Sequence, residues 1–308
     1  MVNHDAPRRF PERREPTRTV AGADAAESRR SHYLFRGGRC TPKICHRYIV
    51  TIPEEAHAID GELNDLPDGW CDVIGRGRMG EALATALSAA AVAVRGPLGR
   101  GANGEDAAIV LLCVPDREIA SASAALAPGA MVGHVSASAS LDLLAPHERF
   151  AMHPLLSVVG SGAEFAGATC AIDGSTPRAL AVARALAVRL GMRARIVPPE
   201  HRALYHAAAS VASNYLITIE GMAERLAGSV GLDRSALVPL VRASVDHWAA
   251  LGARRALTGP IVRGDDETVA RQRLAVGDAA PNLLPLWDAL AAATRELASA
   301  AVPAPART

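Results

Sequence analysis

Short apolar runs alternate with alanine-rich amphipathic segments through the middle of the chain, as in a parallel sheet buried on both faces. The apolar runs predict strands at 71–74, 91–94, 107–114, 131–135, 169–172 and 193–197. Helices are predicted between them at 81–91, 117–126 and 177–190, the last with Thr176 as its N-cap and Pro177 in its first turn. This alternation predicts βαβ units.

Beyond residue 199 no further strand pattern occurs. Helical periodicity covers 200–226, 234–251, 266–276 and 283–300. The predicted fold class is therefore α/β, a doubly wound Rossmann parallel sheet at 70–198, followed by a second, all-helical domain at 199–308.

Residues 1–69 differ from the rest of the chain. The first fifty carry eleven basic and five acidic side chains, whereas 51–69 carry six acidic and no basic ones. Prolines interrupt the segment and no apolar period is sustained, so we interpret it as a mostly disordered leader. Two alternatives stay open: a basic arm that contacts nucleic acid, and an extension created by a start codon placed too early.

Composition narrows the functional classes. The 308 residues carry 33 basic and 32 acidic side chains, which gives no overall attraction to nucleic acid or anionic membranes. No apolar run approaches the roughly 20 residues of a membrane span, and the basic start lacks a secretory core. We expect a cytoplasmic protein with a small-molecule substrate and with neither a nucleic-acid nor a membrane partner.

Lys43 is the only lysine, which excludes Schiff-base chemistry and Walker-type phosphate binding in the body of the chain. The five cysteines are odd in number and mostly isolated. Cys40, Cys45 and His46 could suggest a metal clip, but no second pair follows at ligand spacing. We expect reduced cysteines and no metal.

The sequence Gly75-Arg-Gly-Arg-Met-Gly80 directly follows a predicted strand and opens a predicted helix. In that context the first glycine permits a tight turn, the second lets a pyrophosphate approach the backbone, and the third lets helix pack on strand. The helix start offers free amides and a positive dipole to phosphates. The predicted cofactor residues here are Gly75, Arg76, Gly77, Arg78, Met79 and Gly80, with Val114, Pro115, His134 and Ser136 at the ends of later strands.

Arginines surround this loop. Arg95 stands where dinucleotide sites usually end their second strand with an acid, Arg100 follows it, and Arg76 and Arg78 lie within the loop. Guanidinium groups suit a 2′-phosphate, so we predict NADP(H) in preference to NAD(H). The alternative is that these arginines are solvated loop residues.

The helical half offers candidate chemistry. His206, Ser210 and Asn214 follow one another at a spacing of four residues, which predicts one polar stripe on an alanine-rich helix. Such a stripe belongs equally to a ligand site or to a helix whose polar groups satisfy their neighbours. In the loop 257–265, Thr258 offers a hydroxyl and Arg263 a carboxylate-binding fork. Asp265 or Asp266 is predicted to cap the next helix.

Two histidines indicate a candidate site at the edge of the predicted sheet. His134, with Ser136, ends a predicted strand, where ligands of open α/β sheets bind, and His153 lies on what we predict to be the following loop. Each histidine alone is more often structural, but several at one crevice favour a site.

These motifs, together with Leu111-Leu-Cys-Val-Pro-Asp116 and the Met-His-Pro sequence ending at 154, resemble Rossmann-like proteins that carry a DUF2520 domain. The similarity covers roughly residues 70–300. It implies an NADP-binding domain joined to a helical domain that forms a homodimer, and its wider relatives are pyrroline-5-carboxylate reductase, ketopantoate reductase and the β-hydroxyacid dehydrogenases. The family has no settled reaction.

One departure matters. The dehydrogenases and ketopantoate reductases place a catalytic lysine four residues before the asparagine that Asn214 matches, and Ser210 stands there instead. We therefore expect an oxidoreductase that reduces a small carbonyl or imine between the two domains. His206, His153 or His134 would donate the proton, or, as in imine reduction, the substrate would already carry it. Asn214 and Thr258 would orient the substrate, and Arg263 would hold a carboxylate. A non-catalytic NADP-binding regulator is the alternative.

Overall fold

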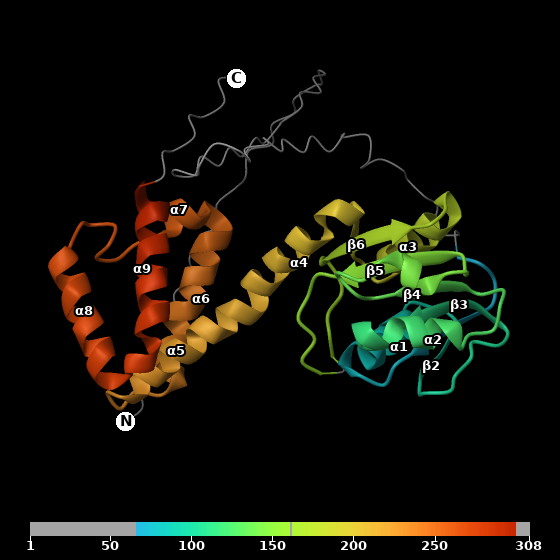
Figure 1. Cartoon of the computed structure of the whole chain (residues 1–308), viewed down its shortest axis with the longest axis horizontal. Coiled ribbons are helices and arrows are strands. Elements are labelled where there is room, and N and C mark those ends of the chain that lie inside the picture. The colour runs from blue at the N-terminus through green and yellow to red at the C-terminus, as the bar shows by residue number, and fades with distance from the viewer. Residues whose placement is uncertain (1–65, 161, 300–308) are drawn as a thin grey trace, which may run out of the picture. The chain divides into compact units, whose positions relative to one another are not determined.

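A computed structural model describes residues 66–160 and 162–299 (Figure 1). A seven-stranded sheet has the order β2-β1-β3-β4-β5-β6-β7, and every neighbouring pair is parallel except β5 and β6. The strands are β1 (Trp70–Ile74), β2 (Val94–Leu98), β3 (Ala107–Leu112), β4 (Met131–His134), β5 (Arg149–Pro154), β6 (Thr169–Gly174) and β7 (Arg193–Ile196). The doubly wound sheet predicted from the sequence is confirmed.

Two apolar clusters hold the helices on the sheet. One face packs against α1 (Arg78–Ala89) and α3 (Pro177–Arg189), through side chains such as Leu83 and Leu186. The opposite face packs against α2 (Ile119–Ala124) and the 3₁₀ helix η3 (Leu141–Leu144). Both clusters consist of buried apolar side chains, so burial of apolar area stabilises the α/β layers.

The remaining helices are α4 (Arg202–Ser210), the π-helical η5 (Val211–Tyr215), α5 (Leu216–Gly228), α6 (Arg234–Leu251), α7 (Ala253–Ala256), α8 (Asp266–Ala279) and α9 (Leu284–Ser299), with 3₁₀ turns η2 (Asp116–Glu118), η4 (Pro199–His201) and η6 (Pro281–Leu283). The predicted caps are confirmed where they could be tested. Thr176 accepts a hydrogen bond from the Ala179 N–H, and Asp265 accepts one from the Thr268 N–H at 3.0 Å. The described part of the chain contains no helix long and apolar enough to cross a membrane.

The prediction of a strand at 91–94 was wrong. Helix α1 ends in a turn at Ala90, and Ala91 has a φ of +59°, so the chain joins the sheet only at Val94. Strand β2 then continues to Leu98, whose carbonyl accepts a hydrogen bond from the Gly75 N–H.

Two further predictions need correction. His153 lies in strand β5 and not in a loop, because Arg149–Pro154 pairs with both β4 and β6. The helix predicted at 200–226 is not one α-helix, since the π-helical segment Val211–Tyr215 interrupts it. Most of the predicted leader, including Cys40, Cys45 and His46, lies outside the described residues.

Candidate functional site

The glycine loop after β1 packs tightly against the next strand. Gly75 has a φ of +130°, and a Cβ atom there would lie 2.2 Å from the Cys113 carbonyl oxygen. A Cβ on Gly80 would lie 1.8 Å from the Gly75 carbonyl oxygen. These two positions therefore demand glycine for the strand–loop–helix turn.

Gly77 is different. A Cβ on this residue would meet no atom within 4 Å, so the space beside its backbone is open. Gly77 also caps α1 without any side-chain hydrogen bond, which leaves the amides of the first turn available. The loop fits a bound diphosphate, because open backbone and free helix-start amides are what such a group requires.

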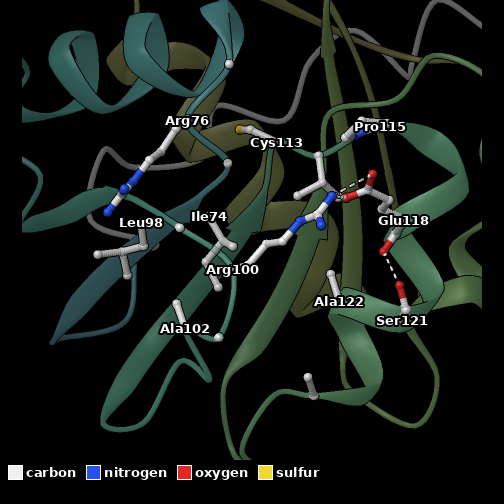
Figure 2. A pocket seen from close by; sticks show the side chains of 16 residues that line it. Ile74, Arg76, Leu98, Arg100, Ala102, Cys113, Pro115, Glu118, Ser121 and Ala122 are labelled. Atoms are coloured by element: carbon white, nitrogen blue, oxygen red, sulfur yellow. Dashed lines mark hydrogen bonds and ion pairs between the residues drawn. The ribbon is translucent and has the colours of Figure 1, made fainter.

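A pocket of about 910 Å³ opens beside this loop (Figure 2). Its walls are the segment 74–77, the residues 98–102 at the end of β2 and beyond it, the residues 113–115 after β3, the last residue of η2 and one side of α2. Of the predicted cofactor residues, the pocket contains Gly75, Arg76, Gly77, Arg100, Val114 and Pro115. Arg78, Met79, Gly80, Arg95, His134 and Ser136 lie outside its lining.

Two guanidinium groups reach this pocket. The Arg76 guanidinium lies against the backbone of Gly99, where a Cβ would be 3.2 Å from its Cζ atom. Arg100 extends from the neighbouring position and forms an ion pair with Glu118 at 3.3 Å. Both arginines thus lie at the carboxyl end of β2, where Rossmann folds bind the adenosine ribose.

Arg95 does not share that position. Its guanidinium binds the buried Asp72 carboxylate at 2.6 and 2.9 Å and donates to the Glu105 carbonyl, while it stacks over the Trp70 ring. The sequence placed Arg95 at the end of the second strand, but β2 runs three residues further. The residues that follow the strand are Gly99 and Arg100, and Arg95 neutralises Asp72.

A second polar group gathers at the ends of β3 and β4. Ser136 Oγ donates to Asp116 at 2.7 Å and accepts from the Ala139 N–H at 3.0 Å, and Ser138 Oγ also donates to Asp116. Ser136 is buried and fixes this loop. Its hydrogen bonds join its own turn to Asp116 at the start of η2.

His134 is fully buried. Its Nδ1 accepts from the Ser136 N–H at 3.2 Å, so the proton of the neutral ring lies on Nε2, which has no hydrogen-bond partner. Burial, aided by Arg202, lowers the pKa of His134 to about 4. His134, which the sequence predicted to contact the cofactor, has no exposed surface and does not line the pocket at Gly75–Gly77.

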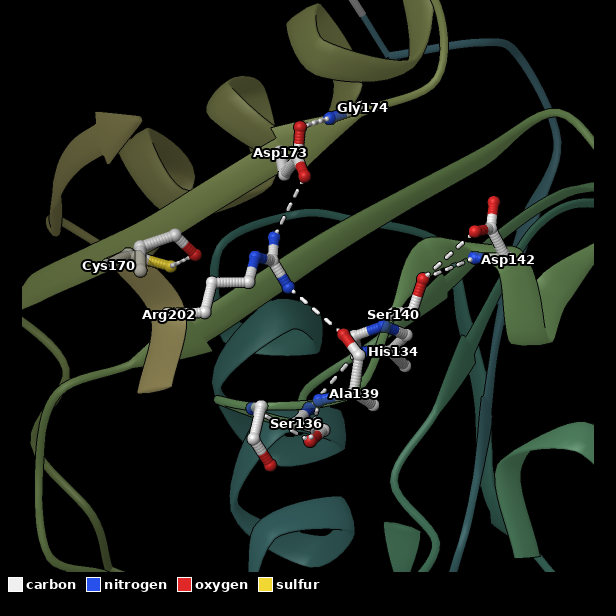
Figure 3. A network of polar contacts seen from close by, with 11 residues as sticks. His134, Ser136, Ala139, Ser140, Asp142, Cys170, Asp173, Gly174 and Arg202 are labelled. Carbon is white, nitrogen blue, oxygen red and sulfur yellow. Dashed lines mark hydrogen bonds and ion pairs between the residues drawn. The ribbon is translucent and has the colours of Figure 1, made fainter. Parts of the chain in front are cut away.

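Helix α4 brings three residues to the sheet. Arg202, which is buried, donates to the Ala139 carbonyl at 3.2 Å and to Asp173 at 3.1 Å (Figure 3). Tyr205 Oη is hydrogen-bonded to His153 Nδ1 at 2.9 Å, and the His206 ring centroid lies 6.4 Å from that of His153. The histidines predicted at 153 and 206 are therefore neighbours.

The electrostatics of this cluster favour neutral rings. Burial, followed by the nearby His206, lowers the pKa of His153 to about 4, and burial raises the pKa of Tyr205 to about 12. At neutral pH His153 is uncharged and Tyr205 keeps its proton. His153 can thus pass a proton along a hydrogen bond but does not store one as an imidazolium.

Sequence reasoning missed Tyr205 and Arg202. Both lie within four residues of His206, on a helix whose other side chains are mostly small and apolar. Arg202 is spaced to share a helix face with Tyr205 and with His206. That spacing was the available signal. The partner of Arg202, Asp173, comes from a strand whose end could not be located from the sequence.

The other predicted residues lie elsewhere. Ser210 ends α4, and Asn214 lies in the π-helical segment, where its Oδ1 accepts from Ser213. Thr258 lines a separate, mainly apolar pocket of about 300 Å³ with α5, α8 and α9, and Arg263 is exposed. Within 66–160 and 162–299 no hydrogen bond or ion pair joins these four to His153 or His206, and no cluster of three metal-ligand side chains occurs.

Comparison with known proteins supports the architecture. A structure of protein TM1727 from Thermotoga maritima is 21% identical, with a TM-score of 0.66 over 75% of this chain and 100% of that one. Protein BF3122 from Bacteroides fragilis is 19% identical, with a TM-score of 0.65 over 74% and 98%. A reductive aminase from Aspergillus terreus, in complex with NADPH and ethyl levulinate, is 14% identical, with a TM-score of 0.56 over 76% and 98%. These likenesses show a shared fold.

A comparison with curated protein sequences finds no match. The family model described as "Domain of unknown function (DUF2520)" matches residues 168–294. The match begins before β6 and so includes the last two strands of the sheet as well as most of the helical part. The resemblance predicted from the sequence is confirmed to this extent: the DUF2520 family model matches residues 168–294, and the fold is Rossmann-like.

Proposed function

We propose that the protein is an NADP-dependent oxidoreductase that reduces a small polar carbonyl or imine compound. The observation that carries this proposal is the pocket at Gly75–Gly77, where open backbone, an uncapped helix start and two guanidinium groups meet. That combination suits a dinucleotide diphosphate together with a further phosphate.

The preference for NADP(H) over NAD(H) rests on Arg76 and Arg100. Both side chains line the pocket at the end of β2, and the positions directly after that strand, Gly99 and Arg100, hold no acid to bind a free 2′-hydroxyl. A guanidinium group binds phosphate through paired charge-assisted hydrogen bonds. Arg95 takes no part in this preference, since Asp72 occupies it.

When bound, the nicotinamide supplies a hydride to the substrate. The chain's own residues must then orient the substrate and supply a proton. We assign the proton to His206, with His153 and Tyr205 as the hydrogen-bonded pair beside it. Asn214, Ser210 and Thr258 remain proposed orienting residues, and Arg263 remains a proposed carboxylate ligand. The reductive aminase with a related fold favours a carbonyl or imine substrate.

The first test is cofactor binding to the full-length protein by calorimetry. We expect NADPH to bind more tightly than NADH, and Gly77→Val to abolish binding of both. Because Gly77 has a φ of −81° and no neighbour within 4 Å of its Cβ position, this variant keeps its fold. Gly162→Ala, also in open space, serves as control. Folded protein that takes up neither cofactor contradicts the proposal.

The second test is turnover. NADPH consumption is followed across keto acids, including ketopantoate, and cyclic imines, first with wild type and then with His206→Gln. A general acid contributes about 10²- to 10⁴-fold, so we expect a loss of kcat in that range at unchanged NADPH affinity. An unchanged kcat would remove His206 from the mechanism.

A non-catalytic NADP-binding regulator is the second candidate. The observation that favours it is Ser210 in the place of the lysine used by the related dehydrogenases, in a chain whose only lysine is Lys43. NADPH binding without turnover on any compound of the panel would support this function.

We also propose that the protein is a homodimer through its helical part. Helix α6 spans eighteen residues, none of which is buried. Its exposed side chains include Leu240, Val245, Trp248 and Leu251. A long helix with an uncovered apolar face is typical of a protein–protein interface.

A further inference from the structure

The ion pair between Arg100 and Glu118 bridges two walls of the proposed cofactor pocket. Arg100 follows β2, whereas Glu118 ends η2 on the other side, and Arg100 Nη2 lies 3.3 Å from each carboxylate oxygen (Figure 2). Glu118 is the single acidic residue among the described residues that line this pocket. A negative charge is therefore fixed where an anionic ligand is expected.

The two pocket arginines differ in this respect. Arg76 lies against the Gly99 backbone and, within the described ranges, forms no hydrogen bond or ion pair. Arg100 already has an anionic partner in Glu118. Any phosphate that binds Arg100 must share this guanidinium with the carboxylate or displace it.

Displacing the Glu118 carboxylate from Arg100 costs little free energy. The Arg100 side chain is 91% exposed, and an exposed ion pair stabilises a protein only weakly because water screens it. The Glu118 side chain is less free to move: it is 29% exposed, and its carboxylate also lies 3.8 Å from Arg117. Arg100 is thus the movable partner, and Glu118 stays in the pocket wall.

We propose that Glu118 competes with the 2′-phosphate of NADPH for Arg100 and so limits the preference of the protein for NADPH over NADH. This inference rests on the proposed function. Glu118 is a specificity-determining residue because its carboxylate opposes only the ligand that carries the extra phosphate. The adenosine of NADH brings no 2′-phosphate and leaves the ion pair intact.

The test is calorimetric titration of the full-length protein with four ligands: NADPH, NADH, 2′,5′-ADP and 5′-AMP. The variants are Glu118→Gln, Arg100→Gln and the double variant. Glu105→Gln is the matched control, since it removes an exposed carboxylate that does not line the pocket. Glutamine keeps the size of Glu118 and removes its charge.

We expect Glu118→Gln to tighten NADPH and 2′,5′-ADP by about two- to fivefold, the range that an exposed ion pair supports, and to leave NADH and 5′-AMP unchanged. The gain in affinity should vanish when Arg100 is already glutamine, because the guanidinium for which Glu118 and the 2′-phosphate compete is then absent. Glu105→Gln should change nothing.

Three results overturn the inference while the proposed function stands: no change in Glu118→Gln, an equal change for ligands with and without the 2′-phosphate, or the same gain in the Arg100→Gln background. If the wild-type protein binds none of the four ligands, the proposed function fails, and this inference fails with it.

Discussion

At the scale of single residues, the ion pair of Arg95 and Asp72 separates a structural arginine from a ligand-binding one. Asp72 is 2% exposed, and Arg95 supplies both of its side-chain hydrogen bonds. Removal of one partner of a buried pair leaves an uncompensated charge. We expect Arg95→Ala to lower the free energy of unfolding by about 2–3 kcal/mol, somewhat less than for a fully buried pair because Arg95 is partly exposed.

Urea unfolding measures this loss, with Arg193→Ala on the exposed edge strand β7 as the control. In the fraction that remains folded, the ratio of NADPH to NADH affinity should equal that of wild type. A selective loss of NADPH affinity would show that Arg95 contributes to cofactor binding.

The burial of His134 leads to a prediction about how the stability of the protein depends on pH. Its pKa is about 4 in the folded protein and near 6.5 when unfolded, so the unfolded chain binds more protons between these values. Stability therefore is full above pH 6.5 and falls as the pH drops toward 4, with a slope of up to about 1.4 kcal/mol per pH unit from this residue. His153 adds a loss in the same window.

We expect His134→Asn to flatten the decline between pH 6 and pH 4, as measured by urea midpoints. His147→Asn provides a comparison, since it replaces another histidine of the same domain. Parallel pH profiles for wild type and His134→Asn would show that His134 is not the titrating group.

At the scale of elements, the strand–loop–helix unit of β1 and α1 depends on one contact. A Cβ on Gly80 would approach the Gly75 carbonyl to 1.8 Å, and that atom belongs to backbone already fixed by β2 and β3. Overpacking against rigid atoms costs about 1–3 kcal/mol or more. Gly80→Ala should reach at least the upper end of that range in chemical unfolding, whereas Gly77→Ala should stay near wild type. Equal stabilities would contradict the tight packing of helix on strand.

Elements also show where sequence reasoning succeeds. The run at 107–114 is apolar on both faces and ends at Pro115, and the run at 71–74 ends at Gly75, so the existence of both strands was predictable. β2 was misplaced because Val94–Leu98 contains arginine, glycine and proline and carries its strand identity only through pairing with β1. β5 was missed for a similar reason, since Arg149–Pro154 is polar at both ends.

In the candidate site, too, features that depend on consecutive residues were predictable and features that depend on tertiary contacts were not. The glycine loop was predictable because its function is local: strand, turn and helix are consecutive in the chain. The contacts of Tyr205 with His153 and of Arg202 with Asp173 join α4 to β5 and β6, and these pairings follow from tertiary packing alone. The π-helical turn at Val211–Tyr215 likewise removes Asn214 from the regular stripe that an unbroken α-helix would give.

At the scale of the whole molecule, the uncovered face of α6 determines the proposed assembly. Leu240, Val245, Trp248 and Leu251 fall within one arc of the helix at 100° per residue, and Asp246 falls outside it. Each such side chain gains about 1.5–3 kcal/mol when it is fully buried, so a second copy that covers the arc would be held firmly.

We expect the wild-type protein to be a dimer in light scattering, and Trp248→Glu to be a folded monomer. The variant puts a charge at the centre of the arc, where burial in an interface is costly, yet Trp248 is 58% exposed in the single chain and its loss should not unfold it. Asp246→Asn changes the charge by one unit in the opposite direction, on the other side of the helix, and should remain dimeric. A dimer that survives Trp248→Glu would place the interface on another surface, and a monomeric wild type would leave the apolar arc of α6 without the partner proposed for it.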